Sequence, residues 1–166
     1  MFDRNLSVAY AAEYAYKYNP AYYNFSPLGG DCTNFVSQCL HAGGIPMNYS
    51  PEGWFYSDLN SRAPAWTGVN EFWTFGINNK GEGFKLVPCF PNELEIADIV
   101  QLGNGSRFYH SLIVTKISET EHGKTFYVSA HDRNAFNAPL NGYAFNEMRC
   151  AKVKESLRLR VNYAQP

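Results

Sequence analysis

The alternation of apolar and polar positions divides the chain into a helical first half and a strand-rich second half. Small apolar residues recur at helical spacing between residues 3 and 18, which predicts a first helix there. The apolar positions from Cys32 to Ala42 predict a second helix, which two glycines and a proline bring to an end. A third helix is predicted over residues 68–77, with Thr67 as its N-cap.

The spacing of apolar residues changes to that of strands after residue 83. Strands are predicted at residues 84–87, 97–102, 109–117, 124–130 and 156–162. The third and fourth of these are strong runs separated by a short turn, so they predict an antiparallel hairpin. Helices followed by antiparallel strands form an α+β arrangement, and the length of the chain fits a single domain over residues 1–166.

A long stretch without regular periodicity, residues 45–66, separates the second and third helices. It is rich in proline, serine, asparagine and aromatic residues. Irregular stretches of this length inside a compact domain are often functional loops. We therefore interpret it either as a wall of a substrate site or as packing cover for the core.

The composition of the chain excludes several classes of function. Hydrophobic residues make up 45% and charged residues 17%, as in globular proteins, and a net charge of −1 gives no electrostatic argument for nucleic-acid binding. No apolar run approaches the ~18 residues that a membrane span needs, and the first residues lack a signal-peptide pattern. We expect either a cytoplasmic protein or a mature domain of a longer precursor that is secreted or associated with the cell wall. The oligomeric state stays open.

The chain contains four cysteines, Cys32, Cys39, Cys89 and Cys150. They form no CxxC pair, and the sequence has no HExxH segment, so neither a metal site nor a cofactor is expected. Four cysteines allow three disulfide pairings. The sequence leaves open whether Cys89 pairs with Cys150.

Cys32 stands at the start of the second predicted helix, directly after Gly29, Gly30 and Asp31. The short carboxylate of Asp31 is a favourable N-cap for that helix. The unpaired N–H groups and the dipole of a first turn favour negative charge, so we expect the pKa of the Cys32 thiol to be lowered. Cys39 lies two turns further along the same face and is interpreted as a buried structural cysteine.

The predicted hairpin returns a second group of polar residues to one place. A turn centred between residues 121 and 122 sets His110 opposite Arg133 and diagonally next to His131. A shift of one residue in the register would bring Asp132 or Asn134 to His110 instead. In each case a histidine at the start of one strand meets a polar residue at the end of its neighbour.

A cysteine, a histidine and a third polar group are what a cysteine hydrolase needs. The thiolate of Cys32 would be the nucleophile, and His110 would take the thiol proton and return it to the leaving group. A third residue would bind the other ring nitrogen of His110 and fix its tautomer. A tyrosine hydroxyl of the preceding loop, from Tyr22 or Tyr23, is a candidate donor to the oxyanion.

The segment Gly30–Gln38, with the sequence GDCTNFVSQ, resembles the signature of the bacterial putative amidase domain family. That family is a branch of the papain-like superfamily, which also holds the NlpC-type cell-wall peptidases. The likeness extends to Asn19-Pro20 with Tyr22 and Phe25, Trp66 with Val69, Asp98–Gln101, His110–Thr115 and Ser129–His131. It therefore covers most of the chain.

The resemblance implies a papain-like, NlpC-like fold with the nucleophile at a helix N-terminus, packed on an antiparallel sheet. It also implies hydrolysis of an amide bond by Cys32 and His110, with His131 in the place of the third residue and Asp132 and Asn134 as alternates. The family association suggests a peptide or amide substrate, such as the peptides of peptidoglycan. No glutamine precedes Cys32 in the sequence, so the backbone N–H of Cys32 and a tyrosine hydroxyl would have to bind the oxyanion.

Two alternatives to a hydrolase follow from the same residues. One is an acyl transferase of the same architecture, which passes the acyl group to an amine instead of water. The other is a catalytically retired module that uses the aromatic residues of the 45–66 stretch to bind a peptide or a glycan. Retention of ligand affinity after Cys32→Ser, without turnover by the unmodified protein, would distinguish the binding module.

Overall fold

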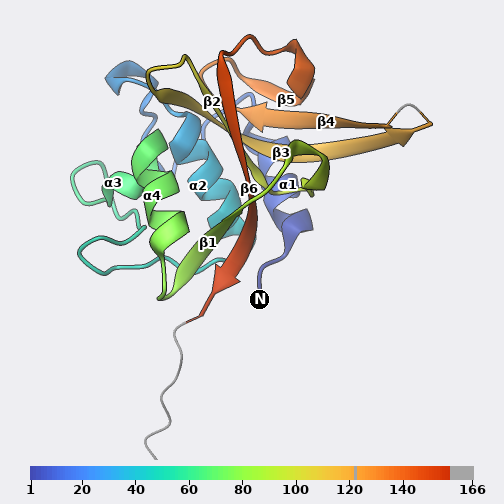
Figure 1. Cartoon of the computed structure of the whole chain (residues 1–166). Coiled ribbons are helices and arrows are strands. Elements are labelled where there is room, and N and C mark those ends of the chain that lie inside the picture. The colour runs from blue at the N-terminus through green and yellow to red at the C-terminus, as the bar shows by residue number, and fades with distance from the viewer. Residues whose placement is uncertain (122, 158–166) are drawn as a thin grey trace, which may run out of the picture.

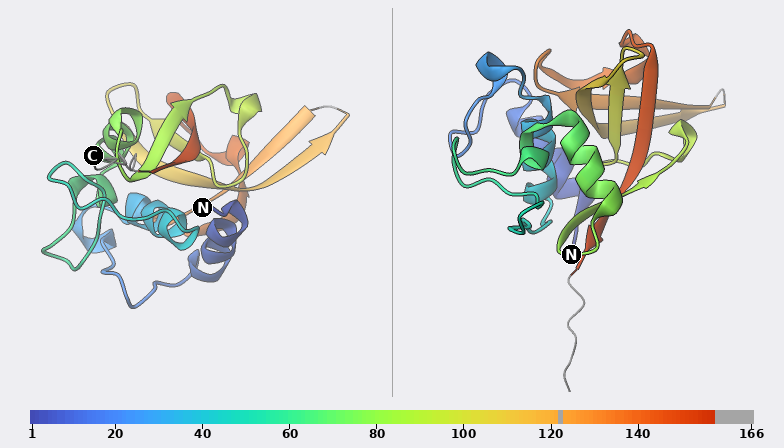
Figure 2. Two further views of the ribbon diagram at one scale, coloured as in Figure 1. Left: turned by 90° about the horizontal axis from the view of Figure 1, so that it is seen from below. Right: turned by 60° about the vertical axis from the view of Figure 1, so that its left-hand side comes forward.

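A computed structural model describes residues 1–121 and 123–157, in which the helices lie against one face of a single sheet (Figure 1). The helices of this part of the chain are α1 (Arg4–Tyr14), α2 (Cys32–Ala42), α3 (Pro64–Thr67) and α4 (Val69–Asn78). The strands are β1 (Gly83–Pro88), β2 (Ile99–Gly103), β3 (Phe108–Thr120), β4 (Gly123–Ala130), β5 (Ala135–Pro139) and β6 (Glu147–Ser156). The helical layer and the sheet are separate in the views of Figure 2.

The sheet has the order β1-β6-β2-β3-β4-β5, and every neighbouring pair is antiparallel. The last strand in the sequence, β6, therefore lies between β1 and β2 rather than at an edge. This confirms the predicted α+β class with helices packed on an antiparallel sheet.

The second predicted helix is found with the predicted bounds, whereas the first is shorter than predicted. α1 ends at Tyr14 instead of continuing to residue 18. Beyond Tyr14 the chain tightens, and the N–H of Lys17 donates to the carbonyl of Tyr14 at 3.3 Å. The same carbonyl accepts a second hydrogen bond, from Nε2 of His131 at 2.8 Å, so a residue more than a hundred positions away contacts the end of this helix.

Thr67 is not the N-cap of the helix that follows it, which corrects the prediction. Thr67 is the last residue of α3, and Gly68 occupies the N-cap position of α4 without any side-chain cap. Pro64 supplies a fixed φ at the start of α3, where such a φ is favourable. The short helix α3 was not predicted.

The β3–β4 hairpin forms with the predicted register in its outer half. Ile117 faces Phe126, as a turn between residues 121 and 122 requires. A register shift between Val114 and Lys116 then moves the inner half by one residue, so that Ile113 faces Ser129. If this inner register is extended to the end of the hairpin, Asp132 is the residue opposite His110.

Two strands, β5 and β6, were not predicted. β5 is short and interrupted by an irregularity, and β6 has no regular alternation of apolar and polar residues. The strand that was predicted at 156–162 falls mostly outside the described residues, because the structure describes the chain only to residue 157.

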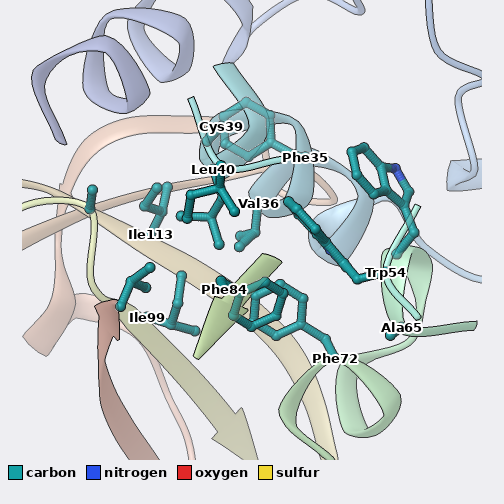
Figure 3. Close-up of a cluster of buried hydrophobic side chains, with 14 of the residues drawn as sticks. Phe35, Val36, Cys39, Leu40, Trp54, Ala65, Phe72, Phe84, Ile99 and Ile113 are labelled. Atoms are coloured by element: carbon teal, nitrogen blue, oxygen red, sulfur yellow. The ribbon is translucent and has the colours of Figure 1, made fainter. Parts of the chain in front are cut away.

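Apolar side chains fill both faces of the sheet. Between the sheet and the helices, Val36 and Leu40 of α2 point toward Ile99 and Ile113 of the strands (Figure 3). On the other face a second cluster is covered by short 3₁₀ segments at residues 91–93 and 140–142. Burial at about 25 cal/mol per Å² of apolar area makes these two clusters the main source of stability.

α2 lies at the centre of the helical layer, between α1 and the α3–α4 pair (Figure 1). All nine residues from Cys32 to Leu40 are buried, so the helix has almost no face toward solvent. Its polar side chains are bonded inside the protein. The amide oxygen of Asn34 accepts from Nε1 of Trp66 at 2.8 Å, and the hydroxyl of Ser37 donates to the carbonyl of Trp66 at 2.9 Å.

Candidate active site

Cys32 is the first residue of α2 and is 6% exposed. It borders a cavity of about 640 Å³ at the end of the sheet where β2 ends and β3 begins. The residues that line this cavity are Ser26, Gly29, Gly30, Cys32, Thr67, Val69, Leu102, Tyr109, His110, Asp132, Arg133, Tyr143 and Ala144. A cysteine and a histidine thus line the same cavity.

His110 lies near the start of β3, opposite Leu102 of β2, and is 7% exposed. Its Nε2 atom is buried and has no hydrogen-bond partner within residues 1–121 and 123–157. The ring of Tyr143 lies beside it, with 6.2 Å between the ring centroids. A buried polar atom without a partner is costly, and such atoms in folded proteins often belong to functional sites.

Asp132, not Asp31, caps α2. One carboxylate oxygen of Asp132 accepts from the backbone N–H of Cys32 at 2.9 Å and from the N–H of Asp31. The other oxygen accepts from the hydroxyl of Ser26 at 3.0 Å. The predicted N-cap, Asp31, makes no such bond to the first turn. A carboxylate from the β4–β5 connection therefore occupies the positive end of the α2 dipole.

Gly30 makes room for this carboxylate. A Cβ atom on Gly30 would lie 2.9 Å from the Asp132 oxygen that caps the helix. Gly30 also has a φ of +134°, which side chains rarely adopt. Asp132 itself has a φ of +65°, a left-handed conformation that aspartate tolerates better than most residues. Both backbone conformations serve the approach of Asp132 to α2.

Asp31 and His131 form a buried pair behind the nucleophile. Oδ2 of Asp31 lies 2.5 Å from Nδ1 of His131, and the two side chains are 0% and 1% exposed. Nε2 of His131 donates to the carbonyl of Tyr14 at 2.8 Å, and its ring stacks on Phe35 at 4.2 Å. Both ring nitrogens are thus used, and neither is directed to His110. The structure does not bring His131 to the place of a third catalytic residue.

The surroundings of Cys32 raise its pKa, which contradicts the lowered value that was expected. Burial, as the largest cause, raises the pKa of the thiol from 9.0 to about 11, and the charge of Asp132 adds to it. The backbone N–H of Ser111 and the hydroxyl and backbone of Thr33 act in the opposite direction. The prediction failed chiefly because Cys32 is buried, which disfavours the thiolate, and also because the carboxylate of Asp132 lies next to it.

The pKa of His110 is shifted downward from 6.5. Burial is the largest cause, since it disfavours the charged imidazolium. The carboxylate of Asp132 opposes the shift, and the charge of Arg133 adds to it. Asp132 thus acts electrostatically on both Cys32 and His110, and the neutral imidazole is the form that can accept a proton from the thiol.

The remaining candidate residues lie elsewhere. Tyr22 stacks on Trp66 at 5.9 Å, and neither it nor Tyr23 lines the cavity. Asn134 is exposed and does not line it either. No residue of the 45–66 stretch contributes to this cavity within the described part of the chain, so the stretch is not a wall of it.

Tyr109, Tyr143 and Arg133 line the cavity and were not proposed as site residues. Tyr109 and Arg133 are direct neighbours of His110 and Asp132, so proximity in the sequence was an available signal for them. Tyr143 lies beyond β5, and no pattern in the sequence indicated that it returns to His110. The hydroxyl of Tyr109 donates to the carbonyl of Ala144 at 3.3 Å, which ties the two sides of the cavity together.

A second hollow, of about 700 Å³, lies between residues 48–53 and α4. Its lining contains neither cysteine nor histidine. Although it is slightly larger than the cavity at Cys32, it offers no nucleophile next to a base. We therefore take the Cys32 cavity as the candidate active site.

In residues 1–121 and 123–157, no three or more His, Cys, Asp and Glu side chains gather in a way that could hold a metal ion. Over the same residues, no helix has the length and apolar character that crossing a membrane requires.

Two curated proteins are similar to most of the chain. The chain is 33% identical over 159 residues to the uncharacterized protein YhbB of Bacillus subtilis, which covers 87% of this chain and 49% of YhbB. It is 30% identical over 142 residues to the uncharacterized protein YjcM of the same organism, covering 80% of this chain and 31% of YjcM. The chain thus spans about half of one relative and about a third of the other.

No solved structure has significant similarity to the chain. The papain-like fold that the resemblance implied is therefore not confirmed by a structural neighbour. A family model does match, over residues 1–153, and it describes a putative amidase domain. The chain belongs to the putative amidase domain family.

Proposed function

We propose that the protein is a cysteine-dependent amidase that cleaves an amide bond through an acyl-enzyme. The family is described by amide chemistry, which indicates the reaction class. The observation that carries the cysteine mechanism is the shared cavity of Cys32 and His110, in which the buried Nε2 of His110 has no partner in the described residues. A nucleophile, a base and a space for substrate are present together.

In the first half of the reaction, His110 takes the proton of the Cys32 thiol, and the sulfur attacks the amide carbonyl carbon. Because the pKa of Cys32 is raised to about 11, the resting thiol is protonated near neutral pH and needs this base. The charge of Asp132 stabilises the imidazolium that forms. His110 then gives the proton to the departing amine, and the C–N bond breaks.

In the second half, water attacks the thioester carbonyl while His110 accepts one of its protons. The C–S bond breaks, the carboxylic acid leaves, and the proton returns to the thiolate. Proton transfer by a positioned base of this kind is worth roughly 10²–10⁴ in rate. The original thiol and neutral imidazole are restored.

Asp132 takes the place that the sequence gave to His131 in this mechanism. It acts on His110 through its charge, while the Asp31–His131 pair holds the start of α2 in position. The N–H of Cys32 is bonded to Asp132, so a substrate carbonyl oxygen has to displace that carboxylate oxygen before this N–H can stabilise the oxyanion. The tyrosines of the 20–30 loop have no part in it.

The resemblance to NlpC-type peptidases makes the peptides of peptidoglycan the first substrates to test. The wild-type protein is incubated with such peptides and with a library of amides, and products are followed by mass spectrometry. Replacing Cys32 by Ser is expected to reduce turnover roughly 10⁴-fold or more, as in other enzymes that lose their nucleophile. Cys89→Ser is the matched control, because Cys89 does not line the cavity, and it should keep full activity.

The same experiment separates the alternatives. Trapping of an acyl group on Cys32, seen as an added mass on its peptide, supports the covalent route. Transfer of the acyl group to an added amine in preference to water would make the protein an acyl transferase. Ligand affinity that is retained in Cys32→Ser, with no turnover of any amide by the wild type, would leave a binding module and overturn the proposal.

A further inference from the structure

A line of side-chain hydrogen bonds crosses three neighbouring strands and ends at the nucleophile. Gln101 of β2 stands opposite Arg149 of β6 on one side and opposite Ser111 of β3 on the other. From Ser111 the line continues to Thr33 of α2, the residue after Cys32. Every link in it is within hydrogen-bond distance, and none of these bonds belongs to the backbone ladder of the sheet.

Arg149 fixes the direction of this line. Its Nε and Nη2 atoms lie 2.8 and 2.5 Å from Oε1 of Gln101. Arginine has no acceptor, so the Gln101 atom that faces it must be the oxygen. The amide nitrogen of Gln101 therefore points away and donates to the carbonyl of Val69 at 2.8 Å and to the hydroxyl of Ser111 at 3.0 Å.

The direction passes on through two hydroxyl groups. The hydroxyl of Ser111 accepts a hydrogen bond from Gln101. Among the described residues, the acceptor found for the hydroxyl hydrogen of Ser111 is Oγ1 of Thr33, 2.9 Å away. A buried hydroxyl without an acceptor is costly, so Ser111 donates to Thr33. Thr33 then has its own hydrogen free for the sulfur of Cys32, which lies 3.9 Å from Oγ1.

We propose that this chain of hydrogen bonds holds the Thr33 hydroxyl as a donor to the sulfur of Cys32. A thiolate has no hydrogen to give, so it is stabilised only when Thr33 is the donor. Arg149, Gln101 and Ser111 are positioning residues in this arrangement, because they act on the sulfur through Thr33. Side chains of β6, β2 and β3 thus orient a donor that α2 itself presents to the nucleophile.

Arg149, the first residue of this series of hydrogen bonds, is held in place by its neighbours. The guanidinium of Arg149 lies between two aromatic rings, 4.2 Å from the centroid of Trp73 and 3.8 Å from that of Phe108. It also donates to the side-chain oxygen of Asn70 at 3.2 Å. Burial lowers the pKa of Arg149 from 12.5 to about 10, so the guanidinium is still charged at neutral pH. A cation fixed between rings has few other orientations.

The donor matters because other groups at Cys32 disfavour the thiolate. The charge of Asp132 faces it from the β4–β5 connection, and His110 faces the same cavity from β3. Asp31, which precedes Cys32, is bonded to His131. The N–H of Ser111 and the hydroxyl and backbone of Thr33 oppose burial and Asp132.

The test is the pH dependence of Cys32 alkylation by iodoacetamide, followed on the Cys32 peptide by mass spectrometry. Thr33→Val removes the hydroxyl and keeps the shape of the side chain. It is expected to raise the apparent pKa of Cys32 by about half to one unit, so that alkylation at pH 8 slows about three- to tenfold. Thr33→Ser retains the hydroxyl and should keep the wild-type profile.

Variants of the other residues in this series of hydrogen bonds test whether it acts as a relay to Thr33. Ser111→Ala and Arg149→Met are expected to move the profile in the same direction by smaller amounts, and Arg149→Lys should restore part of the loss. Thr115→Val is the matched control, because Thr115 is also buried on β3 and its hydroxyl bonds to Ser129 at 2.8 Å, outside the chain. It should leave the profile unchanged.

An unchanged profile in Thr33→Val, or an equal shift in Thr115→Val, would overturn the inference. If Thr33→Val does not fold, Ser111→Ala with the same control decides the question. The consequence for catalysis rests on the proposed function, but alkylation of the resting protein needs no substrate. A shift without any amide turnover would therefore reject only the amidase, and turnover without a shift would reject only the relay.

Discussion

His110 and His131 stand at facing ends of the same hairpin, but their ring nitrogens are in opposite situations. Both nitrogens of His131 are bonded, to Asp31 and to the carbonyl of Tyr14, and the ring is packed on Phe35. The Nε2 of His110 is buried and lacks a partner in the described residues. A histidine whose two ring nitrogens are both hydrogen-bonded supports the fold, whereas a histidine with an unbonded ring nitrogen beside a cavity is available for chemistry.

Replacing His110 is expected to have the largest effect, and to affect activity alone. His110→Gln keeps a polar side chain of similar length but removes the base, so kcat/KM for an amide substrate should fall about 10²–10⁴-fold. The free energy of unfolding should change by less than about 1 kcal/mol, because Nε2 of the ring has no hydrogen bond to lose among the described residues. Kinetics and urea unfolding measure the two quantities. Wild-type activity in this variant would remove His110 from the mechanism.

Replacing His131 is expected to show the reverse pattern. His131→Leu leaves the carboxylate of Asp31 buried without its counter-charge, and loss of one partner of a buried pair costs about 3–5 kcal/mol. Urea unfolding measures the loss. His41→Leu is the control, because His41 is half-buried and, among the described residues, makes one hydrogen bond, to the carbonyl of Ile45. Equal losses in the two variants would show that the Asp31–His131 pair is not special.

The smallest expected effect is on the pH dependence of kcat/KM and of the free energy of unfolding. Since the pKa of His110 lies below 6.5 in the folded protein, the neutral base persists below that pH, and the acid limb of kcat/KM should lie below pH 6.5. The unfolded chain binds more protons there, so the contribution of His110 to stability is complete above 6.5 and is lost as pH falls through that range. The difference in unfolding free energy between wild type and His110→Gln, measured from pH 5 to 7, should therefore shift in favour of the variant at low pH. An acid limb above 6.5 would contradict the shift.

The features that the sequence predicted well depend on local signals. The bounds of α2 were predicted correctly because glycines and a proline stand beside it, and the outer register of the hairpin follows from its turn. The presence of Cys32 and His110 at one cavity follows from those two elements together. The first two inferences use residues that are close in the sequence, whereas the third joins two elements that are far apart.

The features that the sequence did not predict depend on contacts between distant residues. Asp31 and Asp132 are chemically alike, and which one caps α2 is decided by how the β4–β5 connection meets the helix, a hundred residues later. The place of β6 between β1 and β2 likewise depends on the whole sheet. The pKa of Cys32 is raised rather than lowered for the same reason, because distant parts of the chain bury the thiol and also bring the carboxylate of Asp132 next to it.

The complete burial of Cys32–Leu40 has a consequence for interpreting related proteins. Three polar side chains of this segment make hydrogen bonds that hold the fold together: Thr33 bonds to Ser111, Asn34 to Trp66, and Ser37 to Trp54 and Trp66. A relative that has lost all activity would still need these residues to fold, so the GDCTNFVSQ segment diagnoses ancestry rather than turnover. Catalytic competence in such a relative is better judged at Cys32, His110 and Asp132 together.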